Sequence, residues 1–391
     1  MRLAIEGGRP VRETFLPYAR QLVSDDDVQA VVEVLRSDWL TTGPKVEKFE
    51  KTFASYTGAK CAVAMSSGTA GLHAAAFAAG LGPGNEAITT PLTFVASANC
   101  VLYQQARPVF VDVQPDSLNI DPARIEPRIT SRTKVLIPVD YAGQPADLDE
   151  LREIAARHGL VVIEDAAHAL GATYKGRRVG TLAALTVFST HPVKHITTGE
   201  GGMVVTDDPE LARQLRVFRN HGITSEARDR QGWFYEMTAL GHNYRLTDIQ
   251  CALGLSQLQK LDVWLERRRA IASSYNEAFA GMSEIEIPAV RSDRESAWHL
   301  YPIRLNLSKL RVGRGEVFKA LRSENIGVNV HYIPVPWHPY YHRLGYDRGQ
   351  WPVAESAYER LISLPIFAGM TDSDTQDVID AVTKVVTAYR A

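Results

Sequence analysis

The sequence predicts an α/β fold built on a mostly parallel sheet that is covered by helices. In the first half of the chain, short β-branched runs alternate with longer amphipathic runs, the pattern of strands that are joined by helices. Several of the short runs are apolar on both faces, as strands of a sheet with two covered faces are. The 391 residues are too many for one small core. We therefore expect a large domain and a smaller one.

Seven short apolar runs are the predicted strands of the sheet. They cover residues 60–65, 86–89, 108–113, 134–139, 160–165, 184–189 and 202–206. Their alternation with helical segments predicts right-handed crossovers between parallel neighbours.

Helices are predicted where apolar residues recur at helical spacing. The first helix begins after Ser24, which is a favourable N-cap residue, and another covers residues 147–158. A long helix runs from Asp248 through Trp264, and the last one covers residues 373–389.

Prolines become frequent after the long helix, and this change of composition predicts a domain boundary. We expect residues 1–255, which include an N-terminal arm, to form the large domain. Residues 256–391 are then the small C-terminal α/β domain.

The composition favours a protein that acts on a small molecule. The chain has 43 basic and 45 acidic side chains, which give a formal net charge of -2. It therefore lacks the excess of positive charge that is typical of proteins that bind nucleic acids. The three cysteines are far apart, which favours reduced thiols in a cytoplasmic protein and neither disulfides nor a metal site. No signal peptide and no membrane-spanning run is recognisable, so we expect no membrane association.

Lys194 is the first candidate for chemistry. It lies between the apolar run that contains Phe188 and the glycine-rich turn that ends at Gly202. An amine among apolar and small residues loses its charge more readily than a solvated one, which suits the capture of a carbonyl as a Schiff base. An ordinary loop lysine is the alternative, and other parts of the chain decide between the two.

Two further segments lie where parallel sheets bind ligands. The turn Ser66-Ser-Gly-Thr69 stands between a strand and a helix, so its backbone N–H groups can converge on an anion such as a phosphate. Asp165 ends a predicted strand, at the edge where ligand-contacting side chains are found, and its carboxylate can hold a pyridinium nitrogen protonated. The structural alternatives are an N-cap turn and an aspartate that caps a turn.

Ser189 and Phe94 complete one coherent set. Ser189 ends the strand before Lys194, and its hydroxyl can reach the same phosphate. Phe94 can lie flat on an aromatic ring, although a phenylalanine in such a run is more often part of the core. An anion turn, a ring platform, a strand-end carboxylate, a strand-end serine and a lysine together describe a pocket for pyridoxal 5′-phosphate.

With these motifs the chain resembles the DegT-type sugar aminotransferases, which depend on pyridoxal phosphate and have the type I aminotransferase fold. The likeness runs from about Pro17 to the C-terminus. It includes Asp38-Trp-Leu-Thr-Thr-Gly43, the Ser-Gly-Thr turn, Thr90-Pro-Leu-Thr-Phe94, Glu164-Asp-Ala-Ala-His168, the lysine segment and Gly241-His-Asn-Tyr-Arg-Leu-Thr-Asp248. The resemblance implies a large domain with a seven-stranded sheet and a smaller α/β domain.

The resemblance also implies roles for the residues of the pocket. Lys194 would form the Schiff base with the cofactor, Asp165 would pair with the pyridine nitrogen, and Phe94 would stack on the ring. The phosphate would be bound by Gly68, Thr69 and Ser189.

Other implied contacts involve a second subunit and the substrate. His168 would lie near the phenolic oxygen of the cofactor, where many relatives have glutamine. Asn243 would reach the cofactor phosphate from the neighbouring subunit of a homodimer, so a monomer is expected to be inactive. The candidate contacts of the sugar nucleotide are Thr41, His331, Tyr332 and the polar loop 221–230.

Within the family the chain looks most like the branch that makes UDP-4-amino-4,6-dideoxy-N-acetyl-β-L-altrosamine for pseudaminic acid, a cell-surface sugar. That resemblance implies amino transfer, with glutamate as donor, to C4 of UDP-2-acetamido-2,6-dideoxy-β-L-arabino-hex-4-ulose. The suggestive segments are Asp140-Tyr-Ala-Gly-Gln144, His168-Ala-Leu-Gly171, Gly254-Leu-Ser-Gln-Leu258 and Val330-His-Tyr-Ile-Pro334. The turn Ser66-Ser-Gly-Thr69 departs from this branch, which often has Asn-Ser-Ala-Thr.

Several alternatives stay open at this point. The acceptor could be another keto sugar nucleotide, such as GDP-4-keto-6-deoxymannose or a UDP-4-keto-pentose. The related sugar 3-dehydratases have histidine in place of the lysine, so Lys194 argues against that reaction. A non-catalytic regulatory binding protein is disfavoured because the lysine, the carboxylate and the phosphate turn are all retained.

Overall fold

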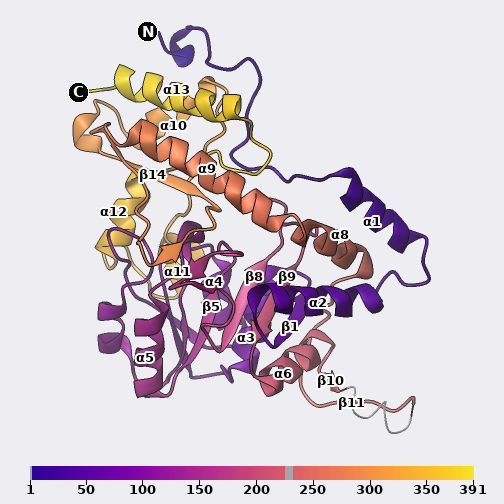
Figure 1. The fold of residues 1–391 in the computed structure, drawn as a ribbon. Coiled ribbons are helices and arrows are strands. Elements are labelled where there is room, and N and C mark those ends of the chain that lie inside the picture. The colour runs from indigo at the N-terminus through magenta and orange to yellow at the C-terminus, as the bar shows by residue number, and fades with distance from the viewer. Residues whose placement is uncertain (1, 225–231) are drawn as a thin grey trace.

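The computed structural model describes residues 2–224 and 232–391, and its centre is one seven-stranded sheet (Figure 1). The strand order is β1-β9-β8-β5-β4-β2-β3. Neighbours are parallel from β8 to β3, whereas β9 is antiparallel to both β1 and β8. The predicted α/β fold with a mostly parallel sheet is confirmed. The strands are β1 (Cys61–Met65), β2 (Glu86–Thr89), β3 (Arg107–Phe110), β4 (Thr133–Ile137), β5 (Val161–Asp165), β8 (Leu185–Ser189) and β9 (Gly202–Thr206).

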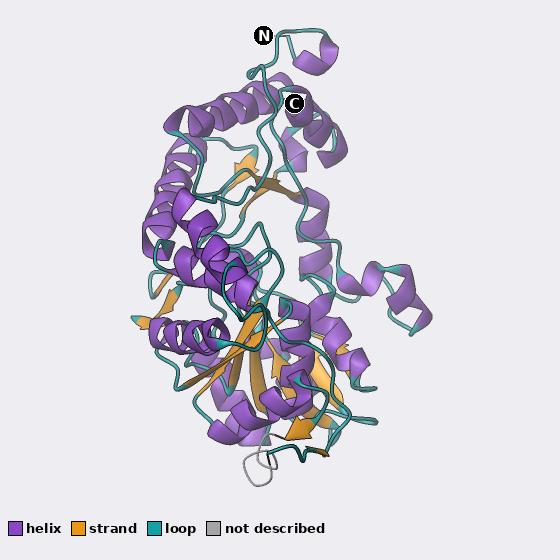
Figure 2. Cartoon of the chain, turned by 90° about the vertical axis from the view of Figure 1, so that its right-hand side faces the viewer, coloured by secondary structure: helices purple, strands orange, loops and turns teal. Residues whose placement is uncertain are grey.

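Helices cover both faces of this sheet (Figure 2). Alternate residues of a strand point to opposite faces and therefore belong to different hydrophobic cores. In β1, Val63 and Met65 pack in the core with α3, α4 and α6, while Ala62 and Ala64 pack in the core with α2 and α8. α5 packs on the second face, farther along the sheet. These helices are α2 (Pro44–Thr57), α3 (Gly68–Ala78), α4 (Ala96–Tyr103), α5 (Leu148–His158), α6 (Pro209–Arg219) and α8 (Asp248–Leu258).

The C-terminal part has its own three-stranded antiparallel sheet, with the order β12-β14-β15. Long helices pack on it and share one hydrophobic core, which also includes Leu3 and Leu16 of the N-terminal arm. The arm, which the sequence assigned to the large domain, therefore packs on the C-terminal part. The boundary between residues 255 and 256 stays a prediction. The elements are β12 (Ile285–Glu286), β14 (Tyr301–Leu305), β15 (Leu361–Leu364), α9 (Leu261–Phe279), α10 (Arg314–Ser323), α12 (Pro352–Arg360) and α13 (Asp372–Ala388).

The remaining elements are short, apart from α1, which projects from the body (Figure 1). They are α1 (Asp25–Leu35), α11 (Pro339–Arg343), β6 (Thr173–Tyr174), β7 (Arg177–Arg178), β10 (Ile223–Thr224), β11 (Glu236–Met237) and β13 (Arg294–Glu295). The 3-10 turns are η1 (Ala4–Glu6), η2 (Pro122–Arg124), η3 (Glu126–Arg128), η4 (Tyr141–Gly143), η5 (Leu307–Lys309) and η6 (Val335–Trp337). Within the described ranges, no helix is long and apolar enough to cross a membrane.

One predicted helix is wrong. The sequence predicted a single helix from Asp248 through Trp264, but the structure divides this segment into α8 and α9. Lys260 N–H donates to the carbonyl of Gln257, three residues back, at 3.0 Å, so the regular spacing of four residues is interrupted there. The side chain of Lys260 crosses to α1, where its amine lies 2.9 Å from a carboxylate oxygen of Asp27. α1 itself begins with the predicted Ser24 cap, which forms a capping box with Asp27.

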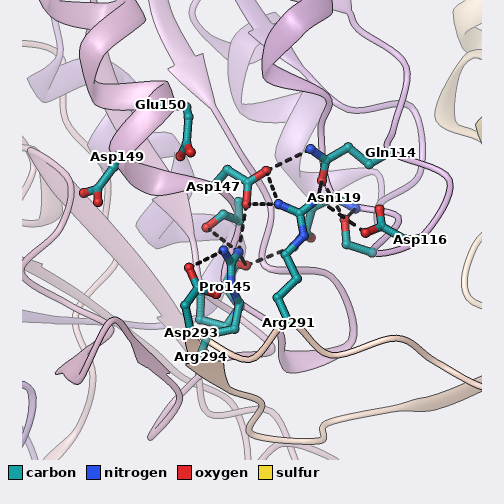
Figure 3. Close-up of polar contacts among 12 residues, drawn as sticks. Gln114, Asp116, Asn119, Pro145, Asp147, Asp149, Glu150, Arg291, Asp293 and Arg294 are labelled. Carbon is teal, nitrogen blue, oxygen red and sulfur yellow. Dashed lines mark hydrogen bonds and ion pairs between the residues drawn. The ribbon is translucent and has the colours of Figure 1, made fainter.

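A buried ion cluster joins the C-terminal segment before β14 to the N-terminus of α5 (Figure 3). Asp147 Oδ1 accepts hydrogen bonds from Arg291 Nη1 at 2.7 Å and from Arg294 Nη1 at 3.0 Å. Gln114 donates to the other carboxylate oxygen at 2.8 Å. The side chains of Arg294 and Asp147 are only 3% and 6% exposed. The cluster therefore fixes the position of the C-terminal segment on the large sheet.

Replacing Asp147 by Asn should destabilise the protein strongly. The buried Arg294 guanidinium would then lose the carboxylate of Asp147 and keep only its pair with the more exposed Asp293, so we expect a loss of about 3 kcal/mol in the free energy of unfolding, the lower end of the cost of breaking a buried ion pair. Asp149→Asn is the matched control because this carboxylate is half-exposed and pairs with Lys175 on the surface, where an ion pair contributes about 0–1 kcal/mol. Urea unfolding of both variants measures the difference, and equal losses would contradict a clamping role for Asp147.

Candidate active site

A cavity of about 560 Å³ lies where β5, β8 and α3 meet the C-terminal part. Parallel strands expose their carboxyl ends at one edge, and Asp165 and Ser189 are the last residues of β5 and β8 at that edge. α3 begins there too, at Gly68, directly after β1. The cavity brings together most of the residues that the sequence singled out, namely Gly68, Thr69, Phe94, Asp165, His168, Ser189, Lys194, His331 and Tyr332.

Lys194 reaches the cavity from the loop after β8. Burial lowers the pKa of its amine to about 8, and the nearby Arg268 charge acts in the same direction, while the carboxylate of Asp165 opposes the shift. Lys194 Nζ lies 3.4 Å from His299 Nε2, and no carboxylate in the described parts of the chain lies within ion-pair distance of it. Near neutral pH this amine is uncharged far more often than an ordinary lysine is, as nucleophilic attack on a carbonyl requires.

Asp165 is held by two hydrogen bonds at the floor of the cavity. Its Oδ2 accepts from Ser97 Oγ at 2.6 Å, and its Oδ1 accepts from the backbone N–H of Ala167 at 3.2 Å. Burial raises the pKa of Asp165, whereas both hydrogen bonds and the positive charge of Lys194 favour the ionised form. A positively charged ring nitrogen placed against this carboxylate would favour the ionised form further.

The predicted anion turn is built from backbone groups that approach one another closely. Ser67 is the N-cap of α3, and its Oγ accepts from Ala70 N–H at 3.0 Å. A Cβ on Gly202 would lie 2.5 Å from Ser67 O and 2.7 Å from Gly68 N, so β9 can pass behind the turn only without a side chain. A Cβ on Gly68 would lie 3.0 Å from Ser189 Cβ, which places that hydroxyl beside the helix N-terminus. This cradle suits a phosphate.

Phe94 is not a core residue, because 56% of its surface is exposed and the ring lines the cavity. It stands 6.1 Å from the ring of Tyr332, measured between centroids, in a tilted arrangement. The apolar face of Phe94 is therefore available to a flat ring. Together with a reactive amine, a buried carboxylate and an anion cradle, it makes the cavity fit pyridoxal phosphate.

His168 and Tyr332 close the cavity from two different parts of the chain. Tyr332 Oη lies 3.0 Å from His168 Nε2, and His168 Nδ1 has no partner in the described structure. Burial first, and then the charge of Lys194, lowers the pKa of His168 well below its ordinary value. His331 Nδ1 lies 2.9 Å from Ser363 Oγ. The neutral His168 can accept or donate one hydrogen bond at a ligand oxygen.

Two predicted residues do not line this cavity in the single chain. Thr41 borders a second cavity of about 840 Å³, which Asn220 and Arg245 also line. Asn243 is exposed and pairs with Asn220 in an isolated bridge near the same region. Of the predicted substrate loop 221–230, residues 225–230 lie outside the described residues.

Three residues of the site have no strong local signal in the sequence. Ser97 follows the ring platform by three positions and bonds Asp165. Arg268 and His299 lie 74 and 105 residues after Lys194, in the C-terminal part. The sequence does contain one indication of His299. It is a histidine inside the apolar run Ala297-Trp-His-Leu-Tyr301, and a buried polar group in such a run requires a hydrogen-bond partner.

Comparisons with known proteins agree with this geometry. The sequence profile described as the DegT/DnrJ/EryC1/StrS aminotransferase family matches residues 21–383. The spore coat polysaccharide biosynthesis protein SpsC of Bacillus subtilis is 45% identical over 381 residues, which are 96% of this chain and 98% of SpsC. A Methanocaldococcus jannaschii protein, MJ1066, is also 45% identical, over 97% of this chain and all of its own length.

Solved structures of aminotransferases superpose on this chain over nearly its whole length. Helicobacter pylori PseC, described as an aminotransferase involved in the biosynthesis of pseudoaminic acid, superposes with a TM-score of 0.90 at 33% identity and covers 96% of this chain and 100% of its own. The sugar aminotransferase Spr1654 of Streptococcus pneumoniae, in its PLP form, has a TM-score of 0.90 at 32% identity, with 96% of this chain and 99% of its own covered.

Proposed function

Because this chain belongs to the DegT/DnrJ/EryC1/StrS aminotransferase family, we propose that it transfers an amino group from glutamate to C4 of a nucleotide-linked 4-keto-6-deoxy sugar. It is a sugar aminotransferase that depends on pyridoxal phosphate and has the type I fold. The observation that carries the proposal is one cavity in which Lys194, Asp165, Phe94 and the turn at Gly68 face the same space.

Bound pyridoxal phosphate supplies an aldehyde that amines capture and a ring that takes up electron density from the adjoining carbon. Gly68, Thr69 and Ser189 would hold its phosphate, and Phe94 would hold its ring. Asp165 would keep a proton on the ring nitrogen. His168 would donate to or accept from the phenolic oxygen.

Lys194 has two tasks in the proposed reaction. As a free amine it would hold the cofactor through its aldehyde group, and once glutamate is bound it would take the proton from the donor carbon. In the second half of the reaction, Lys194 Nζ returns a proton to C4 of the sugar from one face, which sets the new stereocentre. Lys194 is among the residues that line the cavity, as delivery of a proton to a bound sugar requires.

The acceptor that we favour is UDP-2-acetamido-2,6-dideoxy-β-L-arabino-hex-4-ulose, with UDP-4-amino-4,6-dideoxy-N-acetyl-β-L-altrosamine as product. The similarity to PseC over the whole chain supports this choice, and the similarity to SpsC supports a role in cell-surface polysaccharide synthesis. Thr41, His331 and Tyr332 stay the candidate contacts of the sugar. Three free cysteines are in keeping with a cytoplasmic location.

A panel of keto sugars tests the substrate. The favoured UDP-linked ketone, GDP-4-keto-6-deoxymannose and a UDP-4-keto-pentose are each incubated with glutamate, and the products are identified by mass spectrometry and NMR. We expect the highest kcat/KM with the favoured ketone. A tenfold preference for another ketone, about 1.4 kcal/mol in transition-state binding, would overturn the assignment of the sugar. Failure with every ketone would overturn amino transfer to C4.

We further propose that the enzyme is a homodimer in which Asn243 completes the site of the neighbouring subunit. Asn243 is exposed and does not line the cavity of its own chain. Large apolar side chains are exposed on nearby segments, with Trp39 at 53%, Met237 at 65% and Leu240 at 80% exposure. Exposed apolar residues of this size favour a protein interface.

Mixing two inactive variants tests the shared site. Lys194→Ala and Asn243→Ala subunits should each be inactive or weak alone. If Asn243 acts across the interface, a mixed dimer has one site with both native residues, so random mixing restores about one quarter of native activity. Co-refolded or co-expressed subunits give the measurement. No gain over the separate variants would place Asn243 in its own subunit's site or exclude the dimer.

A further inference from the structure

His299 lies within hydrogen-bond distance of the reactive lysine. Its Nε2 lies 3.4 Å from Lys194 Nζ, and its side chain is buried, with 3% of the residue exposed. The ring packs against His168, with 4.4 Å between centroids. His299 Nδ1 has no hydrogen-bond partner in the described structure, so the contact with Lys194 is the principal polar contact of this imidazole.

The backbone around His299 is held in an unusual conformation. Trp298 has a φ of 50°, in the left-handed region that a tryptophan rarely adopts. Its N–H donates to Ser296 Oγ at 3.1 Å. The guanidinium of Arg268, buried in the C-terminal part, donates to the carbonyl oxygens of Trp298 and Ile366 at 3.0 Å each. Such a costly local conformation persists where the surroundings fix it, and it is concentrated at functional sites.

The large domain fixes the same segment from the other side. Gly143 has a φ of 108°, and a Cβ there would lie 2.8 Å from Trp298 N and 3.0 Å from His299 N. Ala297 N–H donates to Gly143 O at 2.9 Å, and Leu300 N–H donates to Ala142 O at 3.2 Å. The absence of a side chain at Gly143 therefore allows the segment to press against the large domain and carry His299 to Lys194.

The charges around His299 keep its imidazole neutral. Burial is the main cause that lowers its pKa well below the ordinary value, and the charge of Lys194 adds to the effect. A neutral imidazole can accept a hydrogen bond without supplying a negative charge, whereas a carboxylate at the same place would stabilise the ammonium form of the lysine. The titratable or charged groups that surround the pair are Asp165, His168, His195, Arg268 and His331.

We propose that His299 is a positioning residue, whose Nε2 accepts a hydrogen bond from Lys194 Nζ and directs the amine into the cavity without a counter-ion. One N–H of the amine then points to the imidazole. The lone pair of the amine stays free to bind the cofactor or to take a proton from carbon. The inference rests on the role proposed for Lys194. It concerns the lysine alone, so it does not depend on which sugar is the acceptor.

The test measures the reactivity of Lys194 in the full-length protein freed of cofactor. Trinitrobenzenesulfonate labels free amines, and peptide mass spectrometry gives the labelling rate at Lys194 as a function of pH. For the native protein we expect a midpoint at about pH 8, because the free amine reacts and its fraction grows as the pH rises through the pKa. His299→Glu should raise this midpoint by about 1–3 pH units, as a neighbouring carboxylate does.

His299→Gln and His299→Leu separate positioning from packing. Glutamine places an uncharged acceptor near the position of Nε2, so we expect a native midpoint and a kcat within about tenfold of native in the loaded enzyme. Leucine fills the space without an acceptor, and we expect kcat to fall about 10²-fold with little change in KM, the effect of a misdirected catalytic group. The glutamine and leucine variants therefore test the positioning role of His299 even if the glutamate variant does not fold.

His73→Glu is the matched control, because His73 is also a buried histidine but does not line the cavity. It should leave the labelling midpoint of Lys194 unchanged. The proposal is overturned if glutamine and leucine at position 299 lower kcat equally, or if a folded His299→Glu protein keeps the native midpoint. Failure of all keto sugars in the substrate panel would leave these labelling results intact, so the two proposals fail separately.

Discussion

Lys194→Ala should abolish amino transfer while leaving the fold intact. Alanine removes both the nucleophile and the base of the proposed reaction, and loss of a positioned base alone costs about 10²–10⁴ in rate. The buried amine forms no ion pair within the described structure, and Asp165 keeps its hydrogen bonds from Ser97 and Ala167, so the fold should tolerate the removal. Turnover with glutamate and the preferred keto sugar should therefore fall by at least about 10³-fold.

The same variant should still bind the cofactor through the phosphate cradle at Gly68 and Ser189. Borohydride treatment of the loaded native protein should leave a stable cofactor label on residue 194, whereas the alanine variant should carry none. Lys134→Ala, at an exposed position of β4, is the control and should keep native turnover. A Lys194→Ala enzyme with more than a tenth of native turnover would remove the central assignment of the active site.

Asp165→Asn should slow both halves of the reaction. An amide cannot keep the ring nitrogen of the cofactor protonated. The ring would then take up less electron density from the adjoining carbon, both in the reaction with glutamate and in the reaction with the keto sugar. Loss of one preorganised electrostatic contact of this kind costs about 10²–10³ in rate. Stopped-flow absorbance with glutamate alone, and then with the keto sugar, measures the two halves separately.

Ser97→Ala is a milder change at the same carboxylate, and its effect on the rate is compared with that of Asp165→Asn. It removes the 2.6 Å hydrogen bond to Oδ2 but keeps the carboxylate. A hydrogen bond to a charged group contributes about 1.5–3 kcal/mol, so we expect a loss of about 10–150-fold, equal in both halves. If Asp165→Asn impaired one half only, or less than Ser97→Ala does, the carboxylate would not act on the ring nitrogen.

The sheet and the cofactor pocket could be predicted from the sequence because their signals are local. Each of the seven strands is a short apolar run, and Asp165 and Ser189 stand at strand ends that parallel pairing brings to one edge. The division between α8 and α9 was missed because the apolar spacing continues through it. That break depends on Lys260, which turns toward α1, a contact across more than two hundred residues.

In the active site, too, contacts between residues far apart in the sequence could not be predicted from local patterns. Lys194 and the turn at Gly68 lie in short motifs, but the neighbour of the lysine, His299, arrives from the C-terminal part. Its place depends on the positive φ of Trp298 and on the missing side chain of Gly143, neither of which a local pattern reveals. Asn243 could be predicted only by resemblance, since its proposed target lies in another subunit.

The packing of the N-terminal arm beside the last helix has a consequence for the order in which the protein is made. Leu3 and Leu16 share one core with residues of α13, and Glu324 accepts hydrogen bonds from the backbone of Ala4 and Val11 at 2.9 Å each. The large sheet can form on the ribosome from residues already synthesised, but this core waits for α13 to emerge. During translation the arm therefore stays without its partner, and the nascent chain exposes the arm's apolar residues, until α13 has emerged from the ribosome.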